Sequence, residues 1–377
     1  MTTEERLVSP EFYRVLEEKY GVLQEYFDEA VEAAKALSKD RILLAQAASD
    51  ADAILGAETS GLASKAIHAP ETENDLLNRY YRLLILLAHA PEAAESYRKR
   101  GFSEAEIRVI LEEFHRASNA SEQKYGETGL RPMYFGWLCI YVRGEIFHLG
   151  KFEFQVNRLS SPVVYFKNKA LGTSIAMASG GTFHRSGRAL GSAGCTDEQD
   201  AFSPVITETA GAYTGCITVN HGESVSKTPV SLSKSDWTPV LRQGDGILNF
   251  HIAKGAPIQP ENVIPLMEAG FRIAKERYPE WNLKALYCSS WLLDPTIRDL
   301  LGETSNIVRF GDLFTRFPHK SAGTEIFSFV FPLACKDLPP EKWPADTRLM
   351  RALADRYASG GFVTSYEGAV LKDELML

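Results

Sequence analysis

The residues best suited to chemistry stand together in one stretch, 287–295, which reads Tyr-Cys-Ser-Ser-Trp-Leu-Leu-Asp-Pro. If the stretch is a strand, its side chains alternate between two faces. One face then carries Tyr287, Ser289 and Trp291, and the other carries Cys288 and Ser290. A thiol can act as a nucleophile, and a hydroxyl can give a proton to a leaving group. Tyr287, Cys288 and Ser290 are therefore candidate catalytic residues, although a cysteine on an apolar strand is more often an inert core residue.

Two more residues of this stretch, Trp291 and Asp294, are candidate substrate contacts. Asp294 has an alternative role, because an aspartate at this place can cap a helix that begins at Thr296. Asn306 and Arg309 open the next helical stretch and are candidates for holding the acceptor or the cofactor. Arg309 either forms an ion pair or clamps a phosphate or carboxylate.

A second candidate site follows an apolar strand that ends at Ala253. The segment after it, residues 254–259, contains Gly255, which permits a close backbone approach, and a helix begins near Pro260. Free N–H groups at a helix start favour anions, and ligands gather at the carboxyl ends of strands in open α/β sheets. We expect Lys254, Gly255 and Ala256 to hold phosphates and His251 to act as a general base. A plain strand–helix loop explains the segment equally well.

Other motifs exclude several kinds of site. The segment 188–193, Arg-Ala-Leu-Gly-Ser-Ala, matches a coenzyme A phosphate loop, but its flanking glycines and the absence of a helical stripe after it favour a hairpin. No pair of the eight histidines has metal-ligand spacing, so no metal is expected. GxSxG, Walker and GxGxxG motifs do not occur in the sequence.

Composition narrows the class of protein. The chain has 377 residues and a net charge of −8, which argues against nucleic acid and anionic membranes as partners. Its five cysteines form no CxxC pair, and its longest apolar stretches are too short to span a bilayer. The first residues do not form a signal peptide. These features predict a soluble, cytoplasmic protein.

The chain changes character near residue 131. The first 130 residues hold 15 basic and 24 acidic residues, with apolar stripes at helical spacing. Glycine and proline concentrate after this point. We therefore expect an α+β protein, with an all-helical domain at 1–131 and a mixed-sheet domain at 132–377 that includes a β-meander at 162–242. Edge strands of the meander make a homodimer possible.

Within the second domain, the pattern switches to strand–helix–strand. Residues 247–252 and 284–293 are the expected strands, and the helix between them spans 260–277, which together form a βαβ unit. A helical stretch at 307–317, a strand at 325–331 and a last helix at 345–359 are expected to follow.

Several separated motifs resemble the bacterial proteins that pair an N-acyltransferase N-terminal helical domain with a GNAT-like C-terminal domain. The motifs that carry the resemblance are Tyr97-Arg-Lys-Arg-Gly101, Tyr141-x-Arg143-Gly144-Glu-Ile-Phe-x-Leu-Gly150, Phe250-His251-Ile252-x-x-Gly255-x-Pro257, Cys288-x-Ser290-Trp291-Leu-Leu-Asp294-Pro295 and Ser305-Asn306-Ile-Val-Arg309-Phe310. The resemblance implies a GNAT-like core in which the two expected strands of the βαβ unit splay apart. It also implies that the segment from Lys254 to Pro260 takes the place of the pyrophosphate loop. Two features depart from the family pattern: the usual phosphate-loop signature is missing, and Ser289 stands where the family commonly has histidine.

The resemblance and the candidate residues together favour an acyltransferase that uses acetyl-CoA or another acyl-CoA and a small amine or hydroxyl acceptor. Two other functions stay open. A non-catalytic binding or regulatory protein could keep the fold without the chemistry. A thiol hydrolase or acyl carrier could use Cys288 as its nucleophile, with His251 on the neighbouring strand as its base.

Overall fold

The computed structural model describes residues 1–253 and 255–375. The chain forms two units, Met1–His148 and Leu149–Leu377. The sequence places the boundary at 131/132, whereas the structure places it after His148. The difference is the helix α10 (Pro132–Val142), which packs against α4 to α7 of the first unit. Among the described residues, no helix is long and apolar enough to cross a membrane.

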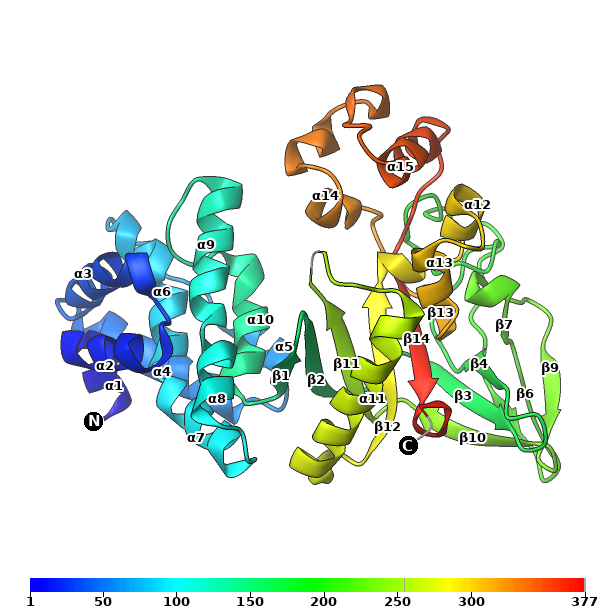
Figure 1. Ribbon diagram of the computed structural model, residues 1–377, viewed down its shortest axis with the longest axis horizontal. Helices are drawn as coiled ribbons and strands as arrows, with labels where there is room; N and C mark the ends of the chain where they lie inside the picture. Colours follow the sequence, from blue (N-terminus) through cyan, green and yellow to red (C-terminus); the bar gives the residue numbers. More distant parts are fainter. Residues whose placement is uncertain (254, 376–377) are drawn as a thin grey trace. The chain divides into compact units, whose positions relative to one another are not determined.

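The first unit is helical, as predicted (Figure 1). Several of its helices start at side-chain caps: the side chain of Ser9 accepts from the N–H of Phe12, and Ser103 and Glu106 form a capping box. Two consecutive helices of the unit, α8 (Glu104–Leu111) and α9 (Glu113–Tyr125), meet at Glu112. The other helices of the unit are α1 (Thr3–Val8), α2 (Pro10–Tyr20), α3 (Phe27–Leu37), α4 (Arg41–Gly56), α5 (Ser60–Ala66), α6 (Asp75–Leu87) and α7 (Ala90–Lys99).

A mixed sheet forms the centre of the second unit, with β1 at the unit boundary as one edge. Its strand order is β1 (Ile146–Leu149), β2 (Phe152–Arg158), β11 (Gly246–Ile252), β12 (Leu283–Ser290), β14 (Tyr366–Leu371) and β13 (Thr315–Pro318). β11 and β12 are parallel and are joined by α11 (Pro260–Arg277), which confirms the βαβ unit. β2 and β14 pair antiparallel with their central neighbours.

The ladder between β11 and β12 is short. It begins at the pair Gly246–Leu283 and ends at the pair Asn249–Tyr287, although each strand continues for three more residues. Over those residues β11 stays paired with β2, and β12 stays paired with β14. The sheet therefore opens between its two central strands, as the family resemblance implies.

The β-meander covers one face of this sheet. It contains β3 (Val163–Asn168), β4 (Ser174–Ala178), β5 (Thr207–Glu208), β6 (Ala212–Gly215), β7 (Thr218–Val219), β8 (Ser224–Val225), β9 (Val230–Ser233) and β10 (Trp237–Arg242). Apolar side chains of β3 and β10 share a core with Ile247, Tyr287 and Phe317 of the sheet. The segment 183–189 closes a tight turn, bridged from Phe183 to Ala189, in agreement with the hairpin interpretation of the Arg188 motif. α11 packs on strands β2, β11 and β12 (Figure 1).

The C-terminal part of the chain differs from the sequence-based expectation. The expected strand at 325–331 is the helix α14 (Ile326–Phe329), because Phe327 and Phe331, one helical turn apart, both pack on Trp343. The expected helix at 307–317 ends early, as α13 (Asn306–Gly311), and is followed by β13. β14 was not expected at all. The remaining helices are α12 (Ile297–Leu301) and α15 (Arg348–Ala358).

Candidate active site

A row of polar side chains lies beside the opening between β11 and β12. Strand register places the row on one face of the sheet, since Asn249 pairs with both Gln155 and Tyr287, and Ser289 pairs with Glu367. Asn249, Tyr287, Ser289, Glu367 and His251 line a cavity of about 100 Å³. Polar groups from the central strands and β14 thus converge where the sheet has lost its ladder.

His251, the base predicted from the sequence, lies in this cavity. Its Nε2 is 3.0 Å from Oε1 of Gln155, which also accepts from the amide of Asn249 at 3.2 Å. An amide oxygen only accepts, so Nε2 carries the proton in this contact. Burial of the ring lowers the pKa of His251 to about 4. The ring is therefore neutral near pH 7 and a weak base.

Glu367 is the most strongly bonded member of the row. Its Oε2 accepts from the hydroxyl of Tyr287 at 3.0 Å and from the hydroxyl of Ser161, while Oε1 lies 3.2 Å from Nδ1 of His319. The carboxyl is buried. Burial, with the nearby Tyr165 and the charge of Glu367, raises the pKa of Tyr287 well above its ordinary value, so this phenol keeps its proton. The sequence analysis named Tyr287 but none of its partners.

Cys288 and Ser290 are not among the residues that line the cavity, because alternation along β12 turns them away from Tyr287 and Ser289. The hydroxyl of Ser290 accepts from the N–H of Leu292 and caps a short 3-10 helix, η4 (Trp291–Leu293). Cys288 is buried, and burial raises the pKa of its thiol to about 12. A nucleophilic thiol needs the opposite environment, so the structure gives no support to a thiol hydrolase.

This burial predicts that iodoacetamide will leave Cys288 unmodified in the native protein. With a pKa of about 12, only about 1 thiol in 10⁴ is ionised at pH 8. The other four cysteines are also free and buried. Mass spectrometry should find five alkylated cysteines after unfolding in guanidinium chloride and none at Cys288 before it. Modification of Cys288 in folded protein at the rate of a free thiol would restore the nucleophile hypothesis.

Trp291 and Asp294, the two candidate substrate contacts of this stretch, are both buried and have contacts within the protein. Trp291 lies in the apolar core shared by α12, α14 and α15. Asp294 is buried and accepts from the backbone N–H groups of Thr296 and Thr364, so it holds the turn after β12 to the start of β14. The first of these bonds is made to Thr296, the N-cap residue of α12, and α12 has no side-chain cap, so the cap interpretation of Asp294 is wrong. Neither residue lines the cavity.

The expected phosphate loop is only partly described, because Lys254 lies outside the described residues. Gly255 has a φ of +75°, which favours glycine, and an added Cβ would meet no atom within 4 Å. The N–H of Ala256 is bonded to the carbonyl of Ala253. Arg309 forms an exposed ion pair of 3.0 Å with Glu261, in the first turn of α11, and Asn306 is exposed at the start of α13. The ion-pair interpretation of Arg309 therefore describes its present contact.

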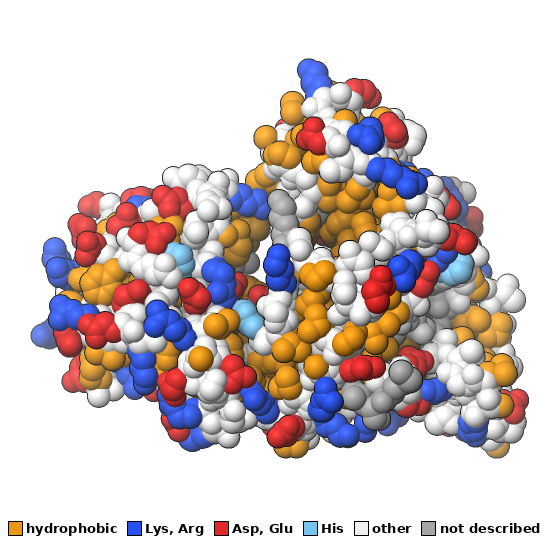
Figure 2. All heavy atoms as spheres, in the orientation of Figure 1, with side chains coloured by type: hydrophobic (Ala, Val, Ile, Leu, Met, Phe, Trp, Pro, Cys, Tyr) orange, Lys and Arg blue, Asp and Glu red, His pale blue; other side chains and the backbone are white. Residues whose placement is uncertain are grey.

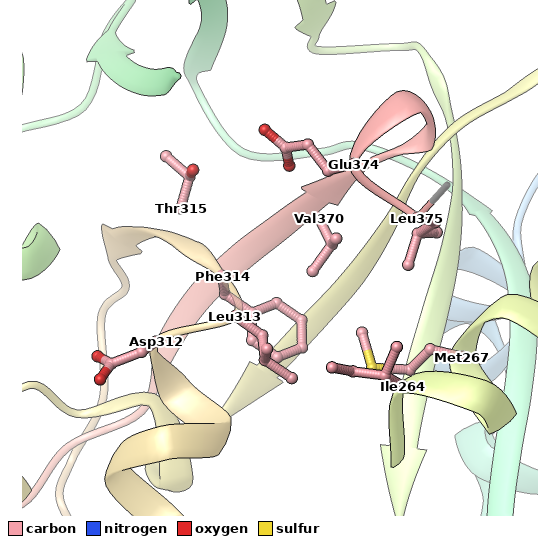
Figure 3. Close-up of a pocket in the computed structure, with 9 residues that line it drawn as sticks. All are labelled: Ile264, Met267, Asp312, Leu313, Phe314, Thr315, Val370, Glu374 and Leu375. Carbon is pink, nitrogen blue, oxygen red and sulfur yellow. The ribbon is translucent and has the colours of Figure 1, made fainter. Parts of the chain in front are cut away.

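A second cavity, of about 300 Å³, lies between α11 and the segment that joins α13 to β13 (Figure 3). Ile264 and Met267 of α11 face Val370 across it, and the carboxylates of Asp312 and Glu374 lie at its edges. Both carboxylates have structural partners: Asp312 accepts from Arg298 and Arg316, and Glu374 accepts from the N–H of Leu371. The cavity's two carboxylates are therefore engaged in structural contacts, and Thr315 is the other polar residue that lines it. Among residues 1–253 and 255–375, no cluster of three or more His, Cys, Asp or Glu could hold a metal ion.

Comparison with known protein families accounts for both units. Residues 11–144 match the N-acyltransferase N-terminal domain, and residues 146–370 match the GNAT-like C-terminal domain. The chain belongs to the GNAT-like C-terminal domain family. This result confirms the resemblance and the α+β fold class predicted from the sequence.

Solved structures with the same fold are acyltransferases. The chain is similar to an acyltransferase in complex with decanoyl-CoA and teicoplanin, with 17% identity, a TM-score of 0.62, and coverage of 96% of this chain and 88% of that one. A mutant acyltransferase in complex with octanoyl-CoA matches with the same values. At this identity the likeness shows the fold. No curated protein sequence matches the chain.

Proposed function

We propose that this protein is an acyl-CoA-dependent acyltransferase that moves an acyl group to an amine or hydroxyl of a small-molecule acceptor. The observation that carries the proposal is the end of the β11–β12 ladder at Asn249 and Tyr287, beside a row of polar side chains. The solved acyltransferases of this fold hold octanoyl-CoA, decanoyl-CoA and teicoplanin, which supports the same classes of substrate here. The five free, buried cysteines suit a reducing compartment, so we place the activity in the cytoplasm.

Direct acyl transfer makes three demands on the site. A base must take a proton from the acceptor, donors must stabilise the oxyanion formed from the thioester carbonyl, and the leaving thiolate must gain a proton. The amide of Asn249 is the donor that we propose for the oxyanion. Tyr287 also lines the cavity, but it donates its only proton to Glu367 and its raised pKa keeps that proton in place, so the protonated base returns a proton to the thiolate. His251 stays a candidate base, and Ser290 and Cys288 have no part in this proposal.

The cofactor phosphates would lie at the loop after β11. The sequence assigns them to Lys254, Gly255 and Ala256. The left-handed conformation of Gly255 favours a close approach of the backbone, and the N–H of Ala256 would have to exchange the carbonyl of Ala253 for the phosphate. Asn306 and Arg309 are the side chains we propose at the acceptor or phosphate edge of the site. Arg309 would have to exchange its present partner, Glu261, for the ligand.

Apolar side chains near the proposed site favour an acyl chain longer than acetyl as the substrate. The segment that carries α14 and α15 gathers apolar side chains on the face shown in Figure 2. Phe329, Leu333 and Leu338 of this segment are more than a third exposed. Trp291, the residue directly after β12, is part of the same apolar core. Trp291 itself is buried, so the exposed apolar side chains of this segment, rather than the end of β12, are the surface that we propose for a medium-length chain.

One observation favours a second candidate, a binding protein without catalysis. Glu261 places a negative charge in the first turn of α11, where a phosphate would otherwise benefit from the helix N-terminus. If this carboxylate stays in place, the loop would repel coenzyme A. Binding of coenzyme A therefore decides between the acyltransferase and the non-catalytic alternative predicted from the sequence.

Calorimetric titration with coenzyme A, acetyl-CoA and octanoyl-CoA tests the proposal. We expect micromolar binding of octanoyl-CoA, weakened by at least about tenfold in Gly255→Asp, because the new carboxylate would face the phosphates. Gly172→Asp is the matched control, since Gly172 also has a positive φ and open space around an added Cβ. Failure of all three ligands to bind at millimolar concentration would leave the binding-protein candidate.

A further inference from the structure

The buried carboxylate of Glu367 contacts the ring of His319, a histidine that lies outside the motifs found in the sequence. We propose that His319, rather than His251, is the general base of acyl transfer, and that Glu367 is the positioning residue that orients it. The inference rests on the proposed function, because it assigns a role within that reaction. A general base needs a ring nitrogen that is held in one orientation, that substrate can reach, and that has no hydrogen-bond partner of its own.

His319 meets the first requirement through the register of the last two strands. β13 pairs with β14 so that Phe317 lies opposite Glu367, which places His319 directly after the strand and within reach of that carboxylate. Its Nδ1 is 3.2 Å from Oε1 of Glu367. The backbone is also held, because the carbonyl of His319 accepts from the hydroxyl of Ser192 at 3.4 Å. The residue is thus fixed both at its backbone and at its ring.

The same contact decides which ring nitrogen is free. Nδ1 faces a carboxylate, which only accepts, at ion-pair distance, so we assign the ring proton to Nδ1 and the lone pair to Nε2. The side chain of His319 is 44% exposed, and Nε2 has no hydrogen-bond partner in the part of the chain that the structure describes. A base held by a carboxylate on one nitrogen and open on the other is the arrangement that orients histidines in acyl-transfer enzymes.

Glu367 is built to hold this position. Its other oxygen accepts from Tyr287 and Ser161, so the carboxylate cannot rotate without losing both bonds. The side chain is 10% exposed, and among the described residues its only ion-pair partner is His319. A buried carboxylate without lysine or arginine stabilises a positive charge that forms on the neighbouring ring. Glu367 also lines the cavity beside the β11–β12 opening, which links His319 to the proposed site of the thioester.

Two other histidines of the second unit, His251 and His184, meet the requirements less well. His251 has a pKa lowered to about 4 and uses Nε2 on Gln155, so it is a weak base at neutral pH. His184 uses both ring nitrogens, Nδ1 with Ser186 at 2.9 Å and Nε2 with Asp197 at 3.1 Å. His319 has one nitrogen on a carboxylate and the other toward solvent.

The step balances without a further reactant. The lone pair of the acceptor nitrogen or oxygen attacks the thioester carbonyl, and Nε2 of His319 takes the acceptor proton as the new bond forms. The C–S bond then breaks, and its electron pair leaves with the thiolate. That thiolate gains one proton, which the imidazolium of His319 gives up through solvent, so His319 returns to its neutral form. The products are the amide or ester and free coenzyme A.

Two measurements on the full-length protein test the assignment. The first is nitrogen NMR of ¹⁵N-histidine-labelled protein, with His319→Gln used to assign the signal. We expect His319 to carry its proton on Nδ1, and the Glu367→Gln variant to lose that preference. A proton on Nε2 in the wild type would overturn the orientation by Glu367, whether or not the protein uses coenzyme A.

The second measurement follows release of coenzyme A from octanoyl-CoA with a thiol reagent, with teicoplanin and simple primary amines as acceptors. We expect His319→Ala to lower kcat by about 100-fold, with octanoyl-CoA binding unchanged and partial rescue by imidazole. Glu367→Gln should lower kcat less, and His68→Ala, an exposed histidine of the helical unit, should leave it unchanged. Unchanged kcat in His319→Ala would overturn the proposal. So would a loss of about 100-fold in kcat that is found in His251→Ala and not in His319→Ala. A wild type that neither binds nor cleaves octanoyl-CoA would instead refute the proposed function.

Discussion

Replacement of Asp294 by alanine is expected to lower the free energy of unfolding by about 3–5 kcal/mol, because it leaves buried polar groups without a partner. The side chain of Asp294 is fully buried and faces the guanidinium of Arg188 at 3.4 Å. It also accepts from the N–H of Thr364 at 2.7 Å and from the N–H and hydroxyl of Thr296 at 2.9 and 2.7 Å. A single carboxylate therefore joins the turn after β12, the start of β14 and the hairpin that carries Arg188.

Chemical denaturation monitored by circular dichroism measures this loss. Asp299→Ala is the control, since Asp299 is exposed on the neighbouring helix α12 and its loss should change stability by no more than about 0.5 kcal/mol. Asp294→Asn keeps an acceptor oxygen and should be less harmful than Asp294→Ala. The opposite result, a stable Asp294→Ala protein that has lost its substrate, would return Asp294 to the binding role suggested by the sequence.

Asp294 also illustrates what a sequence pattern can and cannot say about a site. Its place before Pro295 predicts a cap, but its carboxylate bonds to Thr296 ahead of α12, and α12 has no side-chain cap. The partners Thr364 and Arg188 lie 70 and 106 residues away in the chain, and no local pattern announces them. The same holds for Glu367, whose partners Ser161 and Tyr287 are 206 and 80 residues away. A buried polar group is recognised as part of a site only when the fold brings its partners to it.

Helices and strands with regular periodicity were predictable because their pattern is contained in neighbouring residues of the sequence. The helix at 260–277 has the bounds expected from the sequence, and alternation along residues 284–290 correctly separates Tyr287 and Ser289 from Cys288. β14 was missed because all six of its residues are buried, including Glu367 and Gly368, so it shows no alternation between apolar and polar. The strand β14, which supplies the carboxylate of Glu367 to the site, therefore has no recognisable strand pattern in the sequence.

Gly246→Ala is expected to lower stability strongly. Gly246 lies at the end of β11 that is paired with β12. An added Cβ at Gly246 would lie 1.9 Å from the carbonyl oxygen of Trp281, in the turn that leads into β12. This neighbour is backbone and cannot rotate away, so the turn or the strand must move. We expect a loss of about 3 kcal/mol or more in the free energy of unfolding, at the upper end of overpacking effects. Gly211→Ala is the control, because Gly211 has open space and an ordinary φ.

The consequence of Gly246→Ala should extend to the site, which makes it more than a test of packing. β11 and β12 pair only from Gly246 to Asn249, so every position of the opening is set by this short ladder. Movement of Gly246 away from Trp281 would shift Asn249, further along the same strand, relative to Tyr287. A variant that folds at reduced stability should therefore also bind octanoyl-CoA more weakly than the Gly211→Ala control. Unaltered stability in Gly246→Ala would mean that the turn at Trp281 moves without cost. The pairing at Gly246 would then not determine where β11 and β12 separate after Asn249.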